Sequence, residues 1–204
     1  MSATDAFGYA GCLLLCAAVL ATVLRIDRFP VRIRNAVLPV AVVVLFVPVG
    51  GLPLVAHVRG VTGDLSMPTL ALAAGAIFFR LTGRKLFERR ELDALLWLVA
   101  GAALFLYPFA LGWTPFDPYA LGYGSLAMTG ALLLVTLAAW HRGSKLIVLV
   151  VLAGALACLG GIYESRNLWD TLIDPLAAAY ALVVLLAAAG RKLVSQRREG
   201  ASVV

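Results

Sequence analysis

The residues of this chain that could bind a polar ligand or move a proton lie in three short stretches between long apolar runs. They are carboxylates, two arginines and one histidine, the groups that proteins use for acid–base chemistry and for holding charged ligands. The candidate site residues are His57, Arg59, Asp64, Asp117, Glu164, Arg166, Asp170 and Asp174. Together they predict a carboxylate-rich polar pocket, provided that the apolar runs bring the three stretches together.

The first stretch runs from residue 57 to residue 66 and has two interpretations. In one, His57, Arg59 and Asp64 bind a ligand. In the other, the polar residues and glycines form a tight surface loop, and Asp64 or Ser66 caps the helix that follows. Both interpretations fit the sequence equally well.

The second stretch, residues 163–175, places Asp170 and Asp174 four residues apart. On a continuous helix both carboxylates would project from one face, and the positive end of the helix would offset part of their repulsion. Either residue could be the N-cap, since Pro175 is allowed as the first helical residue after Asp174. We expect a capping role for Asp170. For Asp174 we expect a functional role, because an acid close to hydrocarbon usually faces a partner or a cavity.

The third stretch, residues 113–119, contributes Asp117 between Pro115 and Pro118, a pattern typical of a rigid turn. If the predicted pocket is catalytic, His57 or Asp174 would carry the proton and the two arginines would hold an anion.

The sequence predicts no metal site, and it leaves the cofactor unknown. His57 and His141 fall on opposite membrane faces in the topology derived below, which argues against zinc held by histidines. Magnesium or calcium held by the outer carboxylates fits the chemistry, but no residue spacing requires it. The sequence contains no phosphate-binding glycine loop, no serine-hydrolase elbow and no Cys-x-x-Cys motif.

An irregular segment lies just before the first stretch. Within six residues, Pro48, Gly50, Gly51 and Pro53 remove helical hydrogen bonds and loosen the chain inside an apolar run. In hydrocarbon such a helix break is tolerated only where protein or a water-filled cavity satisfies the freed carbonyl groups. The segment is therefore either a packed kink or the wall of a polar cavity.

The elements that must position these residues are membrane-spanning helices. Of the 204 residues, 62% are hydrophobic and 14% are charged, too few polar side chains to cover a soluble globule. A span needs roughly 20 mostly apolar residues. We predict an all-α bundle of about seven transmembrane helices in one domain over residues 1–204, with spans near 7–24, 36–57, 67–83, 92–113, 121–140, 146–163 and 171–190.

The basic residues predict the direction of the spans, because cytoplasmic loops carry the excess of lysine and arginine. With seven spans, only Arg59 and Arg166 fall on one face, and the other 15 of the 17 basic residues fall on the other. The N-terminus is then outside, the C-terminus is cytoplasmic, and residues 191–204 form a basic cytoplasmic tail. All eight candidate residues lie at the outer face.

These patterns predict a small multi-pass protein of a bacterial inner membrane. Its outer pocket would bind or process an envelope lipid, a lipid-linked precursor or a small solute. A transporter or channel subunit and a non-catalytic accessory subunit of a membrane complex are the alternatives. The expected partners are the bilayer, a lipid or small-molecule ligand and another membrane protein. Nucleic acid is not expected, because the basic residues lie at the ends of apolar runs.

Overall fold

The computed structural model describes residues 2–112 and 115–201 and confirms the predicted all-α class. Trp113 and Thr114 of the third polar stretch, and residues 202–204 of the tail, lie outside the described residues. The described part has nine α-helices, namely α1 (Ala3–Val23), α2 (Val31–Leu45), α3 (Leu54–Thr62), α4 (Met67–Thr82), α5 (Arg89–Ala110), α6 (Leu126–His141), α7 (Lys145–Leu159), α8 (Leu168–Leu172) and α9 (Pro175–Ala201). Two 3-10 helices, η1 (Ile26–Arg28) and η2 (Tyr119–Gly122), and the strands β1 (Pro48–Val49) and β2 (Leu52–Pro53) complete this part.

Three helices of the described part are long and apolar enough to cross a membrane. They are α1, α5 and the portion of α9 from Pro175 to Gln196. Helices α4, α6 and α7 are also apolar but have only 15 or 16 residues. Length and composition therefore support a membrane protein with these three helices as candidate spans.

Local sequence signals explain where several helices begin and end. Ser2 and Asp5 form a reciprocal capping box at the start of α1, and Glu88 and Glu91 form one at the start of α5. Helix α4 ends at Gly83, whose φ of +73° is a left-handed conformation that glycine adopts without strain.

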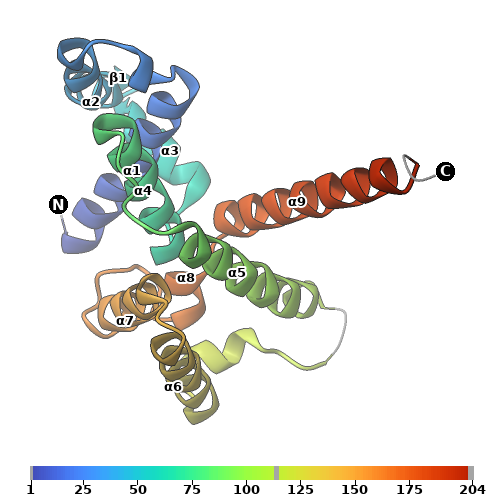
Figure 1. The fold of residues 1–204 in the computed structure, drawn as a ribbon. Coiled ribbons are helices and arrows are strands. Elements are labelled where there is room, and N and C mark those ends of the chain that lie inside the picture. The colour runs from blue at the N-terminus through green and yellow to red at the C-terminus, as the bar shows by residue number, and fades with distance from the viewer. Residues whose placement is uncertain (1, 113–114, 202–204) are drawn as a thin grey trace.

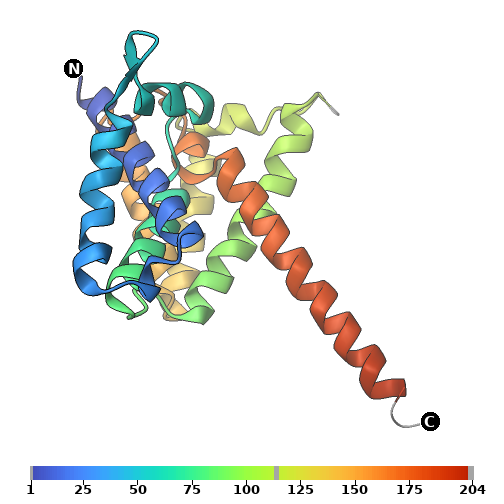
Figure 2. The same cartoon turned by 90° about the horizontal axis from the view of Figure 1, so that it is seen from above.

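The predicted helix over 36–57 differs from the structure, because α2 ends at Leu45 and a β-hairpin follows. Pro48 pairs with Pro53 across the two antiparallel strands, and Gly50 and Gly51 make the turn with φ values of +60° and +90°. The hairpin projects at the upper end of the molecule in Figure 2, and α3 follows it there. The proline–glycine segment thus separates two helices, α2 and α3.

Most buried apolar residues lie around α5, which packs against both α7 and α9. Leu95 and Val99 of α5, Val150 of α7, and Ala178 and Ala181 of α9 belong to this core. A second contact joins α1 to α4 through buried small and branched side chains, among them those at 17, 18, 73 and 77. Small residues at such contacts let helix backbones approach closely, which favours packing where water does not drive association.

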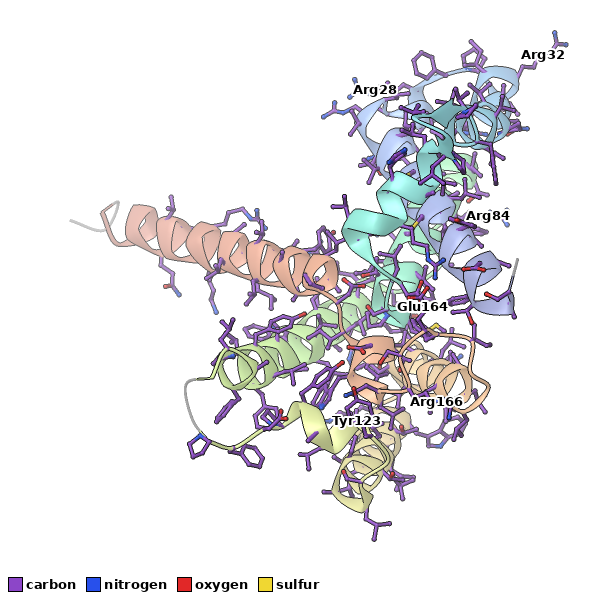
Figure 3. All side chains as sticks on the ribbon, turned by 180° about the vertical axis from the view of Figure 1, so that it is seen from behind. Arg28, Arg32, Arg84, Tyr123, Glu164 and Arg166 are labelled. Atoms are coloured by element: carbon purple, nitrogen blue, oxygen red, sulfur yellow. The ribbon has the colours of Figure 1, made fainter. Side chains whose placement is uncertain are left out.

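The polar segments gather at opposite ends of the bundle. In Figure 2 the N-terminus, the β-hairpin and α3 lie at the upper end, whereas the α1–α2 and α4–α5 connections lie at the lower end. Figure 3 shows Arg28 and Arg32 projecting from the chain near the α1–α2 connection. Helix α9 begins beside α5 and α8 and then leans away from the other helices (Figures 1 and 2). The candidate residues and the basic connections are thus separated by the length of the helices.

Candidate functional site

Arg59 of α3 joins three chain segments at the upper end of the bundle through ion pairs. Its Nη1 donates to Asp5 Oδ1 (3.1 Å), its Nε donates to Asp64 Oδ1 (3.0 Å), and its Nη2 donates to Glu164 Oε1 (2.6 Å). The side chain of Arg59 is 12% exposed and that of Asp64 is 10% exposed, so this pair is largely shielded from water. We call these four residues the Arg59 clasp. Its guanidinium group is occupied by carboxylates of the protein itself.

A glycine of α1 makes room for the clasp. A Cβ atom at Gly8 would lie 2.2 Å from Arg59 Nε and 2.6 Å from Asp64 Oδ1, so any other residue would displace the ion pair. The guanidinium also lies over the ring of Tyr9, with 5.5 Å between Cζ and the ring centroid, a distance typical of a cation–π contact. Gly8 and Tyr9, in the first two turns of α1, therefore both contact or make space for the Arg59 side chain.

Asp174 joins the beginning of α4 to the beginning of α9. Its Oδ2 accepts hydrogen bonds from the backbone N–H of Ser66 (2.8 Å) and the hydroxyl of Thr69 (2.7 Å). Its Oδ1 accepts one from the backbone N–H of Ala177 (2.7 Å), which caps α9. Asp174 is only 5% exposed, and these three donors satisfy its carboxylate. The capping geometry expected for an acid before Pro175 is present here.

Ser66 stands at the N-cap position of α4 but does not cap the helix with its own side chain. Its hydroxyl is buried and has no hydrogen-bond partner among the described residues. The backbone N–H of Ser66 donates to the carboxylate of Asp174, from a segment 108 residues away. Asp64 does not cap α4 either, because its carboxylate accepts hydrogen bonds from Arg59 Nε and from the backbone N–H of Glu164 (3.2 Å).

Asp170 binds a tyrosine and is not a helix cap. Asn167 is the N-cap of α8, so Asp170 lies in the first turn of that helix and accepts a hydrogen bond from the Tyr119 hydroxyl (2.8 Å). Burial of the phenol and this hydrogen bond raise the pKa of Tyr119 above its ordinary value. Asp170 and Asp174 do not share a continuous helix, because Ile173 between α8 and α9 is extended. The condition for a shared helix face is therefore not met, and the two carboxylates are held by different elements.

Asp64 and Glu164 of the clasp, together with Asp170 and Asp174, line a small pocket of about 220 Å³, which we call the outer pocket. Its wall comes from the α3–α4 link and from the chain between α7 and α9. The lining residues are Thr62, Asp64, Tyr163, Glu164, Ser165, Asp170, Ile173, Asp174 and Pro175. Four carboxylates line this space, so its electrostatic character is acidic. In the described part of the chain, no group of three or more His, Cys, Asp or Glu side chains is placed to hold a metal ion.

The structure brings together five of the eight predicted residues and leaves three apart. Arg59, Asp64, Glu164, Asp170 and Asp174 belong to the clasp or line the outer pocket. The other three, His57, Asp117 and Arg166, belong to neither.

His57 binds the carbonyl oxygen of Val49 in the β-hairpin through Nε2 (2.9 Å). Asp117 accepts from the backbone N–H of Tyr119 (2.9 Å) and so forms the expected turn. Arg166, labelled in Figure 3, does not line the outer pocket, and its carbonyl oxygen accepts from Cys158 Sγ of α7 (3.3 Å). The predicted helix break lines neither the outer pocket nor the larger space beside α4; its residues are Pro48, Gly50, Gly51 and Pro53.

Sequence reasoning missed several polar residues that hold this region together. Asn167 Nδ2 donates to the Tyr119 carbonyl (2.9 Å), Trp169 Nε1 donates to the Pro118 carbonyl (2.9 Å), and the Tyr163 hydroxyl donates to the Leu65 carbonyl (2.7 Å). An asparagine directly before a helical segment is a recognisable N-cap signal and could have identified Asn167. The long-range partners carry no local signal, because they lie roughly 50 to 100 residues apart.

A larger space of about 720 Å³, which we call the lateral groove, lies between α1, α4, the α4–α5 link and the beginnings of α5 and α9. Its wall is mostly apolar and includes Leu72, Ala76, Phe79, Leu176 and Tyr180. Thr69 lines the groove near the start of α4, and the basic residues at 80, 85 and 89 line it near the end of α4. Because α4 rises about 1.5 Å per residue, the two ends of the groove are roughly 16 Å apart.

Comparison of the chain with protein-family models, with curated proteins and with solved structures gives no match.

Proposed function

We propose that this chain is a membrane protein that crosses the bilayer seven times and binds an envelope lipid in the lateral groove. Helices α1, α2, α4, α5, α6, α7 and α9 would be the spans, with the N-terminus outside and the C-terminus in the cytoplasm. Helices of 15 or 16 residues reach only about 24 Å, so local thinning of the bilayer and snorkelling side chains would accommodate them.

The charges at the two ends of the bundle support this direction. The clasp and the outer pocket hold acids at one end, whereas residues 25–34 and 80–93, which include the two connections and the helix ends beside them, hold nine basic and four acidic residues. The positive-inside rule puts such basic connections in the cytoplasm. In a variant without the native cysteines, Asp117→Cys and Arg166→Cys should react with an impermeant thiol reagent added to intact cells. Arg84→Cys and Arg142→Cys should not react, and labelling of either would overturn the proposed direction.

The observation that carries lipid binding is the lateral groove itself. Its volume of about 720 Å³ is within the range of small-molecule sites, and its apolar wall would face hydrocarbon in the proposed topology. Val19, Phe79 and Tyr180 on this wall are partly exposed, so the described chain leaves part of each side chain uncovered. An acyl chain in the groove would make the dispersion contacts that these side chains lack.

Lipid binding is tested by filling the groove. Ala76 lines it, whereas Ala131 of α6 is exposed elsewhere on the bundle and serves as the matched control. In liposomes that contain a phospholipid with a photoreactive acyl chain, cross-links should concentrate on groove residues of α1, α4 and α9. Ala76→Phe should remove most of these cross-links, and Ala131→Phe should keep them. Equal cross-linking of the two variants would refute the proposal.

An accessory subunit without a ligand is the second candidate, because the outer charges largely pair with one another in the Arg59 clasp. This candidate predicts cross-links spread over all lipid-facing surfaces, so the same experiment separates the two functions. A transporter or channel would need a polar path along the bundle. The mostly apolar wall of the groove gives that class less support.

A further inference from the structure

The basic residues at one end of the lateral groove indicate which lipid would occupy it. Arg80, Lys85 and Arg89 line this end, and Thr69 is the polar residue near the other end. The groove thus combines an apolar body with a cationic mouth. This pattern matches an amphiphile that has an acyl chain and an anionic headgroup.

The local fold explains why Lys85 stands at the mouth of the groove. Gly83 ends α4, and the link that follows folds back so that the ring of Phe87 packs against Gly75 of α4. A Cβ atom at Gly75 would lie 3.3 Å from Phe87 Cδ2, so the absence of a side chain allows this close return. Lys85, between Gly83 and Phe87, is thereby held beside the groove and not released into a long loop.

Lys85 is also the basic residue of the mouth whose charge is not neutralised by the protein. Arg80 pairs with Asp27, and Arg89 pairs with Asp93 at 3.2 Å. Among the side chains that the structure describes, Lys85 has no carboxylate within ion-pair distance. Its ammonium group is therefore available to a phosphate, and its aliphatic stem can lie along the apolar wall.

We propose that the lateral groove binds a phospholipid of net negative charge from the cytoplasmic leaflet, with its phosphate at Lys85 and its acyl chain between α4 and α9. This inference rests on the proposed lipid function and adds the headgroup class and the leaflet. A zwitterionic phospholipid carries the same phosphate, but its amine cancels the net attraction to the basic mouth. Selectivity for net charge is therefore the measurable consequence.

The test compares full-length wild type, Lys85→Gln and Lys145→Gln. Lys145 is exposed at the start of α7 and does not line the groove, so it controls for general surface charge. Each protein is titrated in detergent with phosphatidylglycerol or with phosphatidylcholine of identical acyl chains, and bound lipid is counted by native mass spectrometry. One basic side chain near an anionic lipid contributes about 1 kcal/mol, which corresponds to roughly fivefold in affinity.

Wild type should prefer phosphatidylglycerol, Lys85→Gln should lose about fivefold of that preference, and Lys145→Gln should retain it. The preference of wild type should also weaken at high salt. Equal affinity of wild type for the two lipids, or equal loss in both lysine variants, would overturn the inference. If Ala76→Phe still abolishes binding of both lipids in that case, the proposed lipid function stands without the headgroup assignment. If Ala76→Phe has no effect either, both proposals fail.

Discussion

Replacement of Asp174 by alanine tests whether this carboxylate fixes the beginning of α9 to the beginning of α4. The variant loses the acceptor for the Ala177 N–H, which is worth about 1 kcal/mol as a helix cap. It also leaves the buried N–H of Ser66 without its acceptor, at a cost of about 1 to 3 kcal/mol. The Thr69 hydroxyl can turn to another acceptor and adds little. We therefore expect a loss of roughly 3 kcal/mol in the free energy of unfolding.

Asp117 supplies the matched control for this experiment. It is also an aspartate that accepts backbone hydrogen bonds, from the N–H groups of Tyr119 and Ala120, but it is exposed. Water replaces the lost acceptor there, so Asp117→Ala should cost below about 1 kcal/mol. The conservative variant Asp174→Asn keeps one carbonyl oxygen and should fall between the two alanine variants.

The measurement is equilibrium unfolding of the purified protein in mixed micelles, followed by circular dichroism. Asp174→Ala should shift the transition clearly further than Asp117→Ala, with Asp174→Asn between them. If both alanine variants lose the same free energy, the hydrogen bonds of Asp174 do not stabilise the junction of α4 and α9, and the reasoning from its burial is wrong.

Three further changes follow from the same contacts. Gly122→Ala would put Cβ 1.7 Å from Asn167 Oδ1 and should destabilise the fold by more than about 2 kcal/mol in the same unfolding assay, whereas Gly130→Ala in open space should be neutral or mildly stabilising. Arg59→Lys should lower the free energy of unfolding by about 1 to 2 kcal/mol, because an ammonium group cannot donate in the fork geometry that the clasp uses. An unfolding transition unchanged from wild type would contradict this prediction. Tyr119 should ionise above its ordinary pKa of 10.0, so the stability it contributes is complete below that pH and is lost as the pH rises through the higher folded pKa. In an ultraviolet titration, Tyr119→Phe should remove an ionisation step at a pH above the ordinary tyrosine pKa. Loss of a step at or below the ordinary pKa would show that the pKa of Tyr119 is not raised.

The sequence predicted helix boundaries well where proline and glycine mark them, and poorly where only hydrophobic length was available. The α4 boundaries followed from local signals, with Pro68 in the first turn and Gly83 at the end, and they agree with the predicted 67–83 within one residue. The prediction over 36–57 was wrong because hydrophobic length alone does not distinguish a continuous helix from two helices joined by a short hairpin.

The sequence predicted which residue types make up the candidate site, but not which residues they contact. Acids in separate polar stretches are visible in the sequence, whereas their partners are set by how the helices pack. Asp174 shows this, because its donors at 66 and 69 lie more than 100 residues away. The lateral groove carries no sequence signal at all. Helix α9 leans away from α1 and α4 (Figure 1), and apolar side chains of these three helices line the space between them.

A hydrogen bond links a residue of the outer pocket to a residue of the lateral groove. Asp174 lines the pocket, Thr69 lines the groove, and the bond between Thr69 Oγ1 and Asp174 Oδ2 lies between the two spaces. The next residues, Leu176 and Ala177, belong to the wall of the groove, so the carboxylate that caps α9 also sets the distance between that wall and α4. In the proposed function Asp174 is therefore a positioning residue. It would influence lipid binding by fixing the position of α9, without touching the lipid. This positioning role explains why an acid lies close to hydrocarbon although the proposed lipid contacts are apolar and basic.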